Sequence, residues 1–207
     1  MEHFEAQSAS TVVVIDIRRP GRTPAAAATA AIVDDAAFEV VFRGTFADVH
    51  RFLARRVGTD LADDLAAETF AVAYRRRTSY DPARGTARVW IFGIAAKVLR
   101  GHWRDERRSL ALQARLGRTV GIACVSDARH DDPIDTRLAS ALRRLPRKHR
   151  EVLLLQVWGQ LTSEEVAAAL GIRPGTVRSR VSRAREQLRA ALNDELGAAR
   201  EPEGAGT

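Results

Sequence analysis

Apolar residues recur at three- and four-residue intervals in two blocks, from Ala36 to about Arg108 and from about Ile134 to about Leu196. In the first block the repeat begins with Phe38, Val41 and Phe42 and continues with Val49, Phe52 and Leu53. An α-helix has 3.6 residues per turn, so this spacing gathers apolar side chains on one face. The pattern predicts an all-α fold.

The first block divides into three predicted helices. The second of them, Asp60–Arg76, sets apolar residues among carboxylates. The turn-forming stretch Tyr80–Gly85 then interrupts the pattern, and a third helix is predicted over Thr86–Arg107.

Residues 109–133 lose the helical spacing and gather Gly, Ser, Asp and Pro133, which is typical of an interdomain linker. We therefore expect two small helical domains joined by a flexible linker. The predicted divisions are a poorly ordered extension (1–35, in which Val12–Ile17 could form a short strand or helix), a first domain (36–108), the linker (109–133), a second domain (134–193) and a flexible tail (194–207).

The second domain contains a predicted helix-turn-helix. Thr162 or Ser163 can cap the start of its first helix, Gly171 suits a left-handed helix end, and Pro174 suits the first turn of the next helix. A short helix, a tight glycine turn and a second helix form the DNA-binding layout.

The second helix of this motif carries the predicted chemistry. Val177, Val181, Ala184 and Leu188 form one apolar stripe. The residues expected to face DNA are Thr176, Arg178, Ser179, Arg180, Ser182 and Arg183. Hydroxyl groups can approach base edges, and guanidinium groups can bind guanine or phosphate. The alternative is a solvated basic helix in an all-helical bundle.

The net charge and its distribution support the prediction that the second domain binds DNA. The chain of 207 residues has a formal net charge of +7, which favours a polyanionic partner, with nucleic acid before an anionic membrane surface. Residues 137–189 hold twelve Arg or Lys against four acidic residues, so the charge is concentrated in the second domain. A merely soluble basic protein would not need that concentration.

Several classes of protein are disfavoured. The chain has one cysteine, Cys124, so neither an intrachain disulfide nor a thiolate metal cluster is expected. No apolar run approaches the ~18 residues that span a bilayer. We expect no cofactor, no metal, no membrane insertion and a cytoplasmic location.

The helix predicted over Thr86–Arg107 has two faces. One is apolar and includes Trp90, and the other carries a row of cations suited to following a phosphate backbone. Trp103 lies among these cations and could stack on a base or could simply pack. The acidic stretch 60–68 suits a protein partner, with a solvated face as the alternative.

Two segments together resemble a known family. Asp60–Phe70, Tyr80-Asp81-Pro82 and Trp90–Lys97 resemble region two of bacterial sigma factors. Leu145-Pro146 followed by Glu151–Leu153, and Leu161–Leu192, resemble region four. With no room for region three, the chain is similar to the extracytoplasmic-function (ECF) group of the sigma-70 family.

The resemblance implies roles for both domains. The acidic helix would dock on the clamp helices of the β′ subunit of core RNA polymerase, through Asp60, Asp63, Asp64, Leu65, Glu68 and Phe70. The Arg75–Arg88 loop and the basic helix would take up the minus-ten element, through Tyr80, Lys97, Arg100, Trp103, Arg104 and Arg107. The helix-turn-helix would recognise the minus-thirty-five element, and the β flap and an anti-sigma factor are further implied partners.

The sequence departs from the family pattern at two places. Ala67 stands where a glutamine is usual, and Ala96-Lys97 where Arg-Asn is usual, which removes hydrogen-bonding groups from both surfaces.

Two other functions remain open at this point. One is a stand-alone helix-turn-helix regulator that binds duplex DNA without polymerase. The other is a nucleic-acid enzyme, although no phosphate loop, metal-ligand cluster or nucleophile–base pattern supports it.

Overall fold

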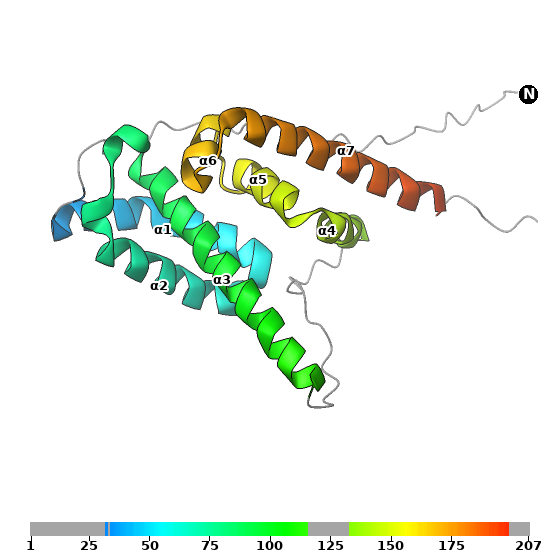
Figure 1. The fold of residues 1–207 in the computed structure, drawn as a ribbon, viewed down its shortest axis with the longest axis horizontal. Coiled ribbons are helices and arrows are strands. Elements are labelled where there is room, and N and C mark those ends of the chain that lie inside the picture. Colours follow the sequence, from blue (N-terminus) through cyan, green and yellow to red (C-terminus); the bar gives the residue numbers. More distant parts are fainter. Residues whose placement is uncertain (1–31, 33, 116–132, 199–207) are drawn as a thin grey trace, which may run out of the picture.

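The computed structural model describes residue 32 and residues 34–115 and 133–198 of the chain (Figure 1). Nearly all of the predicted N-terminal extension and most of the predicted linker and tail lie outside these ranges. The described part is helical, with two 3₁₀ turns and no strand, as the spacing of apolar residues predicted.

The N-terminal domain contains α1 (Asp35–Val57), α2 (Thr59–Arg75) and α3 (Ala87–Arg115), with the 3₁₀ turns η1 (Arg77–Ser79) and η2 (Pro82–Arg84) between α2 and α3. The side chain of Asp34 caps α1 by accepting a hydrogen bond from the amide of Ala37 at 2.7 Å. Gly58 has a φ of 85° and joins α1 to α2 without a longer loop, in a conformation that favours glycine.

The apolar faces of these three helices form the core of the N-terminal domain. Phe52, Leu53 and Phe92 are fully or almost fully buried. Phe42, which the spacing placed in the core, is 36% exposed and contacts Phe46 and Phe70 at the edge of α1 and α2.

Helix α3 is longer than the sequence pattern indicated. It continues to Arg115 instead of ending near Arg107, so the first part of the predicted linker is helical. The residues between these positions include Leu110, Ala111 and Leu112, which are strong helix formers, and no Pro or Gly interrupts them.

The C-terminal domain contains α4 (Pro133–Arg144), α5 (Arg147–Val157), α6 (Ser163–Leu170) and α7 (Pro174–Ala198). The predicted cap of α6 is confirmed at Thr162, whose hydroxyl accepts from the Glu165 amide at 3.1 Å while the Glu165 carboxylate accepts from the Thr162 amide at 2.7 Å. Gly171 ends α6 in the left-handed conformation, with φ 67° and ψ 37°. Helices α6 and α7 therefore form the predicted helix-turn-helix.

The two domains pack directly against each other. Helix α6 lies beside α3, and one continuous set of buried residues runs from the N-terminal domain into the C-terminal domain (Figure 1). Sequence reasoning had identified two helical domains, but it had not predicted this contact.

Candidate nucleic-acid and polymerase interfaces

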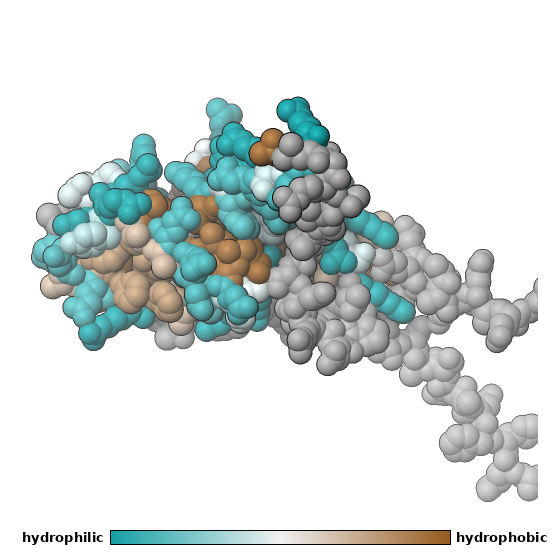
Figure 2. Space-filling model, turned by 90° about the horizontal axis from the view of Figure 1, so that it is seen from below, coloured by the Kyte–Doolittle hydropathy of each residue, from teal (hydrophilic) through white to brown (hydrophobic). Residues whose placement is uncertain are grey.

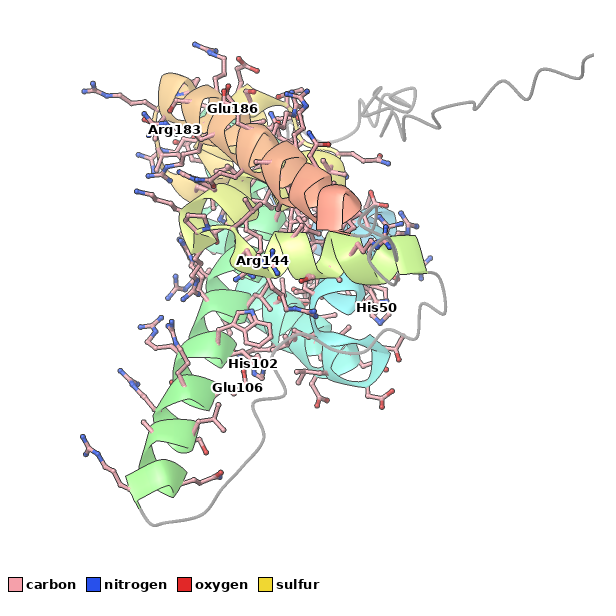
Figure 3. The ribbon with its side chains drawn as sticks, turned by 90° about the vertical axis from the view of Figure 1, so that its right-hand side faces the viewer. His50, His102, Glu106, Arg144, Arg183 and Glu186 are labelled. Atoms are coloured by element: carbon pink, nitrogen blue, oxygen red, sulfur yellow. The ribbon has the colours of Figure 1, made fainter. Side chains whose placement is uncertain are left out.

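Helix α7 presents the predicted DNA-facing residues to solvent. Its apolar stripe is buried at Val177, Val181 and Ala184, which turns the opposite face outward. On that face Arg178, Ser179, Ser182 and Arg183 are exposed, whereas Thr176 and Arg180 are half-buried. Figure 3 shows Arg183 on α7 near the top of the view, with His102 and Glu106 on α3 below it.

Short-range contacts hold part of this face in place. The Ser179 hydroxyl donates to the Thr176 carbonyl at 3.1 Å, and the Ser182 hydroxyl donates to Glu186 at 3.1 Å. Arg178 pairs with Glu164 of α6 at 3.4 Å, and both side chains are largely exposed. Such a surface pair contributes little to stability, so the Arg178 guanidinium can exchange this carboxylate for a phosphate.

The predicted acidic surface on α2 divides into two groups. Asp60, Asp63, Asp64 and Glu68 are exposed. Leu65 and Phe70 are each 4% exposed and belong to the domain core. The four carboxylates are therefore accessible on the surface of α2, and the two apolar residues support the helix from behind.

A shallow groove of about 430 Å³ separates the acidic surface of α2 from the cations of α3. Its lining includes Leu65 and Glu68 on one side and Lys97 and His102 on the other. Sequence reasoning had assigned Glu68 and Lys97 to different partners without bringing them together. Figure 2, seen from below the view of Figure 1, shows apolar patches set among hydrophilic side chains on the side of the molecule that it faces.

The residues predicted to bind the minus-ten element also differ in their exposure to solvent. Lys97, Arg104 and Arg107 are exposed on α3, and Arg100 and Trp103 are half-buried. Tyr80 is only 7% exposed, packs against Trp90 with ring centroids 5.5 Å apart, and donates its hydroxyl to the Gly85 carbonyl at 2.9 Å. Burial, together with the Asp81 carboxylate, raises the pKa of the Tyr80 phenol. In this structure Tyr80 therefore supports the loop instead of lying on its surface.

A cluster of arginines lies where α1, α3 and α5 meet, which the sequence pattern had not revealed. Burial lowers the pKa of Arg56 to about 10; Arg150 and Arg147 add to the shift and Glu151 opposes it. The pKa of Arg147 is lowered by burial and by the neighbouring charges of Arg107, Arg100 and Arg104, again against Glu151. We call these residues the junction cluster: Arg56, Arg100, Arg104, Arg107, Arg147, Arg150 and Glu151.

Clusters of metal-ligating residues and membrane-spanning helices were both sought among the described residues. Within residues 34–115 and 133–198 no group of His, Cys, Asp and Glu is arranged to hold a metal ion. No helix in that part of the chain has the length and apolar content needed to cross a membrane.

Comparison with known proteins identifies the family of both domains. The family model described as "Sigma-70 region 2" matches residues 42–109, and the model described as "Sigma-70, region 4" matches residues 135–188. The RNA polymerase sigma factor CarQ of Myxococcus xanthus is 35% identical over 167 residues, covering 79% of this chain and 94% of that protein. The chain belongs to the sigma-70 family, in its ECF group.

Another relative matches a similar share of this chain. The ECF sigma factor SigC of Mycobacterium tuberculosis is 34% identical over 168 residues, covering 80% of this chain and 89% of that protein. Because such proteins direct promoter-specific initiation, this sigma factor is a subunit of the transcription machinery and not a stand-alone regulator. Its relatives are sigma factors and not enzymes.

Two solved structures match more than three quarters of this chain. CnrH in complex with the cytosolic domain of CnrY has a TM-score of 0.57 at 24% identity, covering 79% of this chain and 92% of CnrH, and supports the fold alone. The sigma factor RpoE of Bartonella quintana, in complex with the anti-sigma factor NepR, has a TM-score of 0.54 at 25% identity, covering 76% of this chain and 95% of RpoE.

Proposed function

We propose that three surfaces of this sigma factor bind core RNA polymerase and the two promoter elements. The four exposed carboxylates of α2 dock on the β′ clamp helices of core RNA polymerase. The cations of α3 hold the minus-ten element, and the outer face of α7 recognises the minus-thirty-five element in the major groove while the C-terminal domain meets the β flap. The protein acts in the cytoplasm, where the polymerase works.

The separation of charge between α2 and α3 supports this assignment most directly. Asp60, Asp63 and Asp64 repel phosphate and suit a basic protein surface, whereas Arg104 and Arg107 attract phosphate. Two helices of one domain thus face different partners, which a subunit bridging polymerase and DNA requires.

Helix α7 fits the minus-thirty-five role by chemistry as well as by layout. Small hydroxyls at Ser179 and Ser182 allow close approach to base edges, and Arg183 can donate two hydrogen bonds to a guanine. We further propose that an anti-sigma factor holds the protein inactive, since RpoE of Bartonella quintana is seen with such a partner.

Co-purification with core RNA polymerase, followed by transcription from a cognate promoter, tests the proposal. Replacing Asp60, Asp63 and Asp64 together with Asn removes three charges from α2 at little cost in volume, and we expect binding to core to fall at least tenfold. Glu39→Gln is the matched control, because Glu39 is an exposed carboxylate of α1 paired only with Arg43. Retention of core binding by the triple variant would contradict the role of α2, and a protein that footprints promoter DNA alone without binding core would contradict the whole assignment.

A further inference from the structure

The outer face of α7 carries a carboxylate among its cations. Glu186 is exposed, and at about 100° per residue it lies about 180° around the helix from the buried Val177. That direction falls between those of Ser179 and Ser182, the two hydroxyls at the centre of the face. Figure 3 shows Glu186 and Arg183 on α7 near the top of the view. The carboxylate therefore belongs to the surface that the proposed function gives to the minus-thirty-five element.

Ser182 holds this carboxylate in place. Its hydroxyl donates to Oε1 of Glu186 at 3.1 Å, about one turn further along α7. Ser179 likewise donates its hydroxyl within the chain, to the Thr176 carbonyl at 3.1 Å. Because each hydroxyl has a single proton, both serines then offer only lone pairs outward. The centre of the face thus presents hydrogen-bond acceptors, with the donors of the arginines on either side.

The position of Glu186 along the helix allows it to share one groove with the serines. With a rise of about 1.5 Å per residue, it stands about 10 Å beyond Ser179 along the helix axis. Successive bases of a DNA strand are about 3.4 Å apart, so a helix that lies along the major groove sets these two side chains about three base pairs apart. Within the part of the chain that the structure describes, no cation forms an ion pair with Glu186, so its charge is available to a ligand.

A carboxylate in the major groove favours one base of the four. Cytosine presents its N4 amino group, which is a donor, whereas guanine presents two acceptors and thymine presents an acceptor and a methyl group. Adenine also has an amino group, but the N7 acceptor beside that group repels a carboxylate. The negative charge of Glu186 opposes the phosphates at every sequence. It therefore weakens binding to sites that offer it no donor, which increases the difference between cognate and non-cognate DNA.

We propose that Glu186 determines specificity for a cytosine in the minus-thirty-five element. Its carboxylate accepts a hydrogen bond from N4 of that base, and Ser182 is the positioning residue that holds the carboxylate toward the groove. The proposal rests on the proposed function of α7 and adds to it the base that this part of the helix recognises.

Glu186→Gln changes the chemistry of this position and keeps its shape. Glutamine retains an acceptor oxygen, loses the charge and gains an amino donor, so it can pair with both N6 and N7 of adenine. Glutamine and glutamate have similar helix propensities, so α7 stays formed, which circular dichroism checks. The matched control is Glu39→Gln, which removes the same charge from α1, where Glu39 pairs with Arg43.

The probe is a pool of duplexes randomised over the minus-thirty-five region of a promoter that the holoenzyme transcribes. Holoenzyme made with each full-length variant binds the pool, and the bound fraction is sequenced. At one position we expect the parent and Glu39→Gln to enrich cytosine about tenfold over the other bases, and Glu186→Gln to enrich adenine instead. Ser182→Ala should reduce the cytosine enrichment at that position without a switch to adenine.

The outcomes separate this inference from the proposed function. Cytosine enrichment that Glu186→Gln leaves unchanged would overturn the base contact. An equal change at every position would overturn it as well, because the carboxylate would then only repel phosphate. Either result leaves the proposed function intact if Arg183→Ala still changes the enriched sequence. A parent holoenzyme that transcribes from the promoter but enriches no sequence in this region would instead refute the proposed role of α7.

Discussion

The carboxylate of Glu151 in α5 lies 3.6 Å from Nε of Arg100 in α3, and it joins the two domains where their arginines crowd together. The Glu151 side chain is 13% exposed. Among the described side chains that shift the pKa values of Arg56 and Arg147, Glu151 is the only carboxylate. It therefore offsets repulsion that would otherwise push the domains apart.

Glu151→Gln should open the chain. Removing this charge leaves the cations of the junction cluster facing each other. We expect the resulting repulsion to weaken the contact between the two domains by on the order of 1–2 kcal/mol. Small-angle X-ray scattering should then give a larger radius of gyration at low salt. Added NaCl should reverse part of the expansion because it screens like charges.

Glu39→Gln, which removes an exposed carboxylate remote from the cluster, is the control for this experiment. If Glu151→Gln and its parent have the same radius of gyration at low and at high salt, Glu151 does not hold the two domains together.

The cap of α6 should matter for stability. Thr162→Ala removes the hydroxyl that accepts from the Glu165 amide, and the loss of such a cap costs about 1 kcal/mol. Urea denaturation should show a lower free energy of unfolding for Thr162→Ala. Thr162→Ser keeps the hydroxyl and should stay within a few tenths of a kcal/mol of the parent; equal losses in both variants would instead point to packing of the Thr162 methyl group.

Arg183 should distinguish base recognition from phosphate contact. If it binds a base edge, Arg183→Ala costs on the order of 1–3 kcal/mol on the cognate minus-thirty-five duplex and less on a duplex changed at the contacted base. Fluorescence anisotropy with the assembled holoenzyme measures both affinities. Arg183→Lys keeps the charge without the two-pronged donor geometry and should resemble alanine in specificity.

Arg189→Ala, further along the exposed side of α7, serves as the control for Arg183 and should weaken both duplexes slightly and equally. Equal weakening of both duplexes by Arg183→Ala would assign Arg183 to a phosphate.

Tyr80 should make the protein less stable at alkaline pH. Its pKa in the fold is above the ordinary value of 10.0, so the folded state holds the phenol proton after the unfolded chain has lost it. This contribution is fully present below about pH 10 and is lost as pH rises through the pKa of folded Tyr80.

Tyr80→Phe provides the comparison. It removes the hydrogen bond to the Gly85 carbonyl, which lowers stability at neutral pH by about 1 kcal/mol, and it should flatten the alkaline loss. Denaturation at several pH values up to pH ~11 compares the two proteins. Identical slopes would show that Tyr80 titrates outside this range.

Local chemistry made the helix-turn-helix predictable from sequence. Its cap at Thr162, its glycine at 171 and the apolar stripe of α7 each depend on residues a few positions apart. The same helical geometry could have separated Leu65 and Phe70 from the carboxylates of α2, because Ala62, Leu65, Ala66, Thr69, Phe70 and Ala73 recur with the period of one buried face.

Long-range packing was beyond the sequence pattern. In the sequence Gly93 is an unremarked glycine within a helix, and only its distance from Ala169 gives it a role. The junction cluster likewise unites residues from α1, α3 and α5 that no spacing rule connects. Tyr80 was predicted to face DNA, and its burial depends on the path of the Pro82–Gly85 turn and on Trp90.

The contact between α3 and α6 also decides which residues position 93 can tolerate. A Cβ on Gly93 would stand 2.6 Å from the carbonyl oxygen of Ala169, so any larger residue forces α6 to shift and weakens the contact between the domains. Alanine favours a helix over glycine by about 1 kcal/mol elsewhere. At position 93 the neighbouring domain therefore overrides the preference of the helix itself.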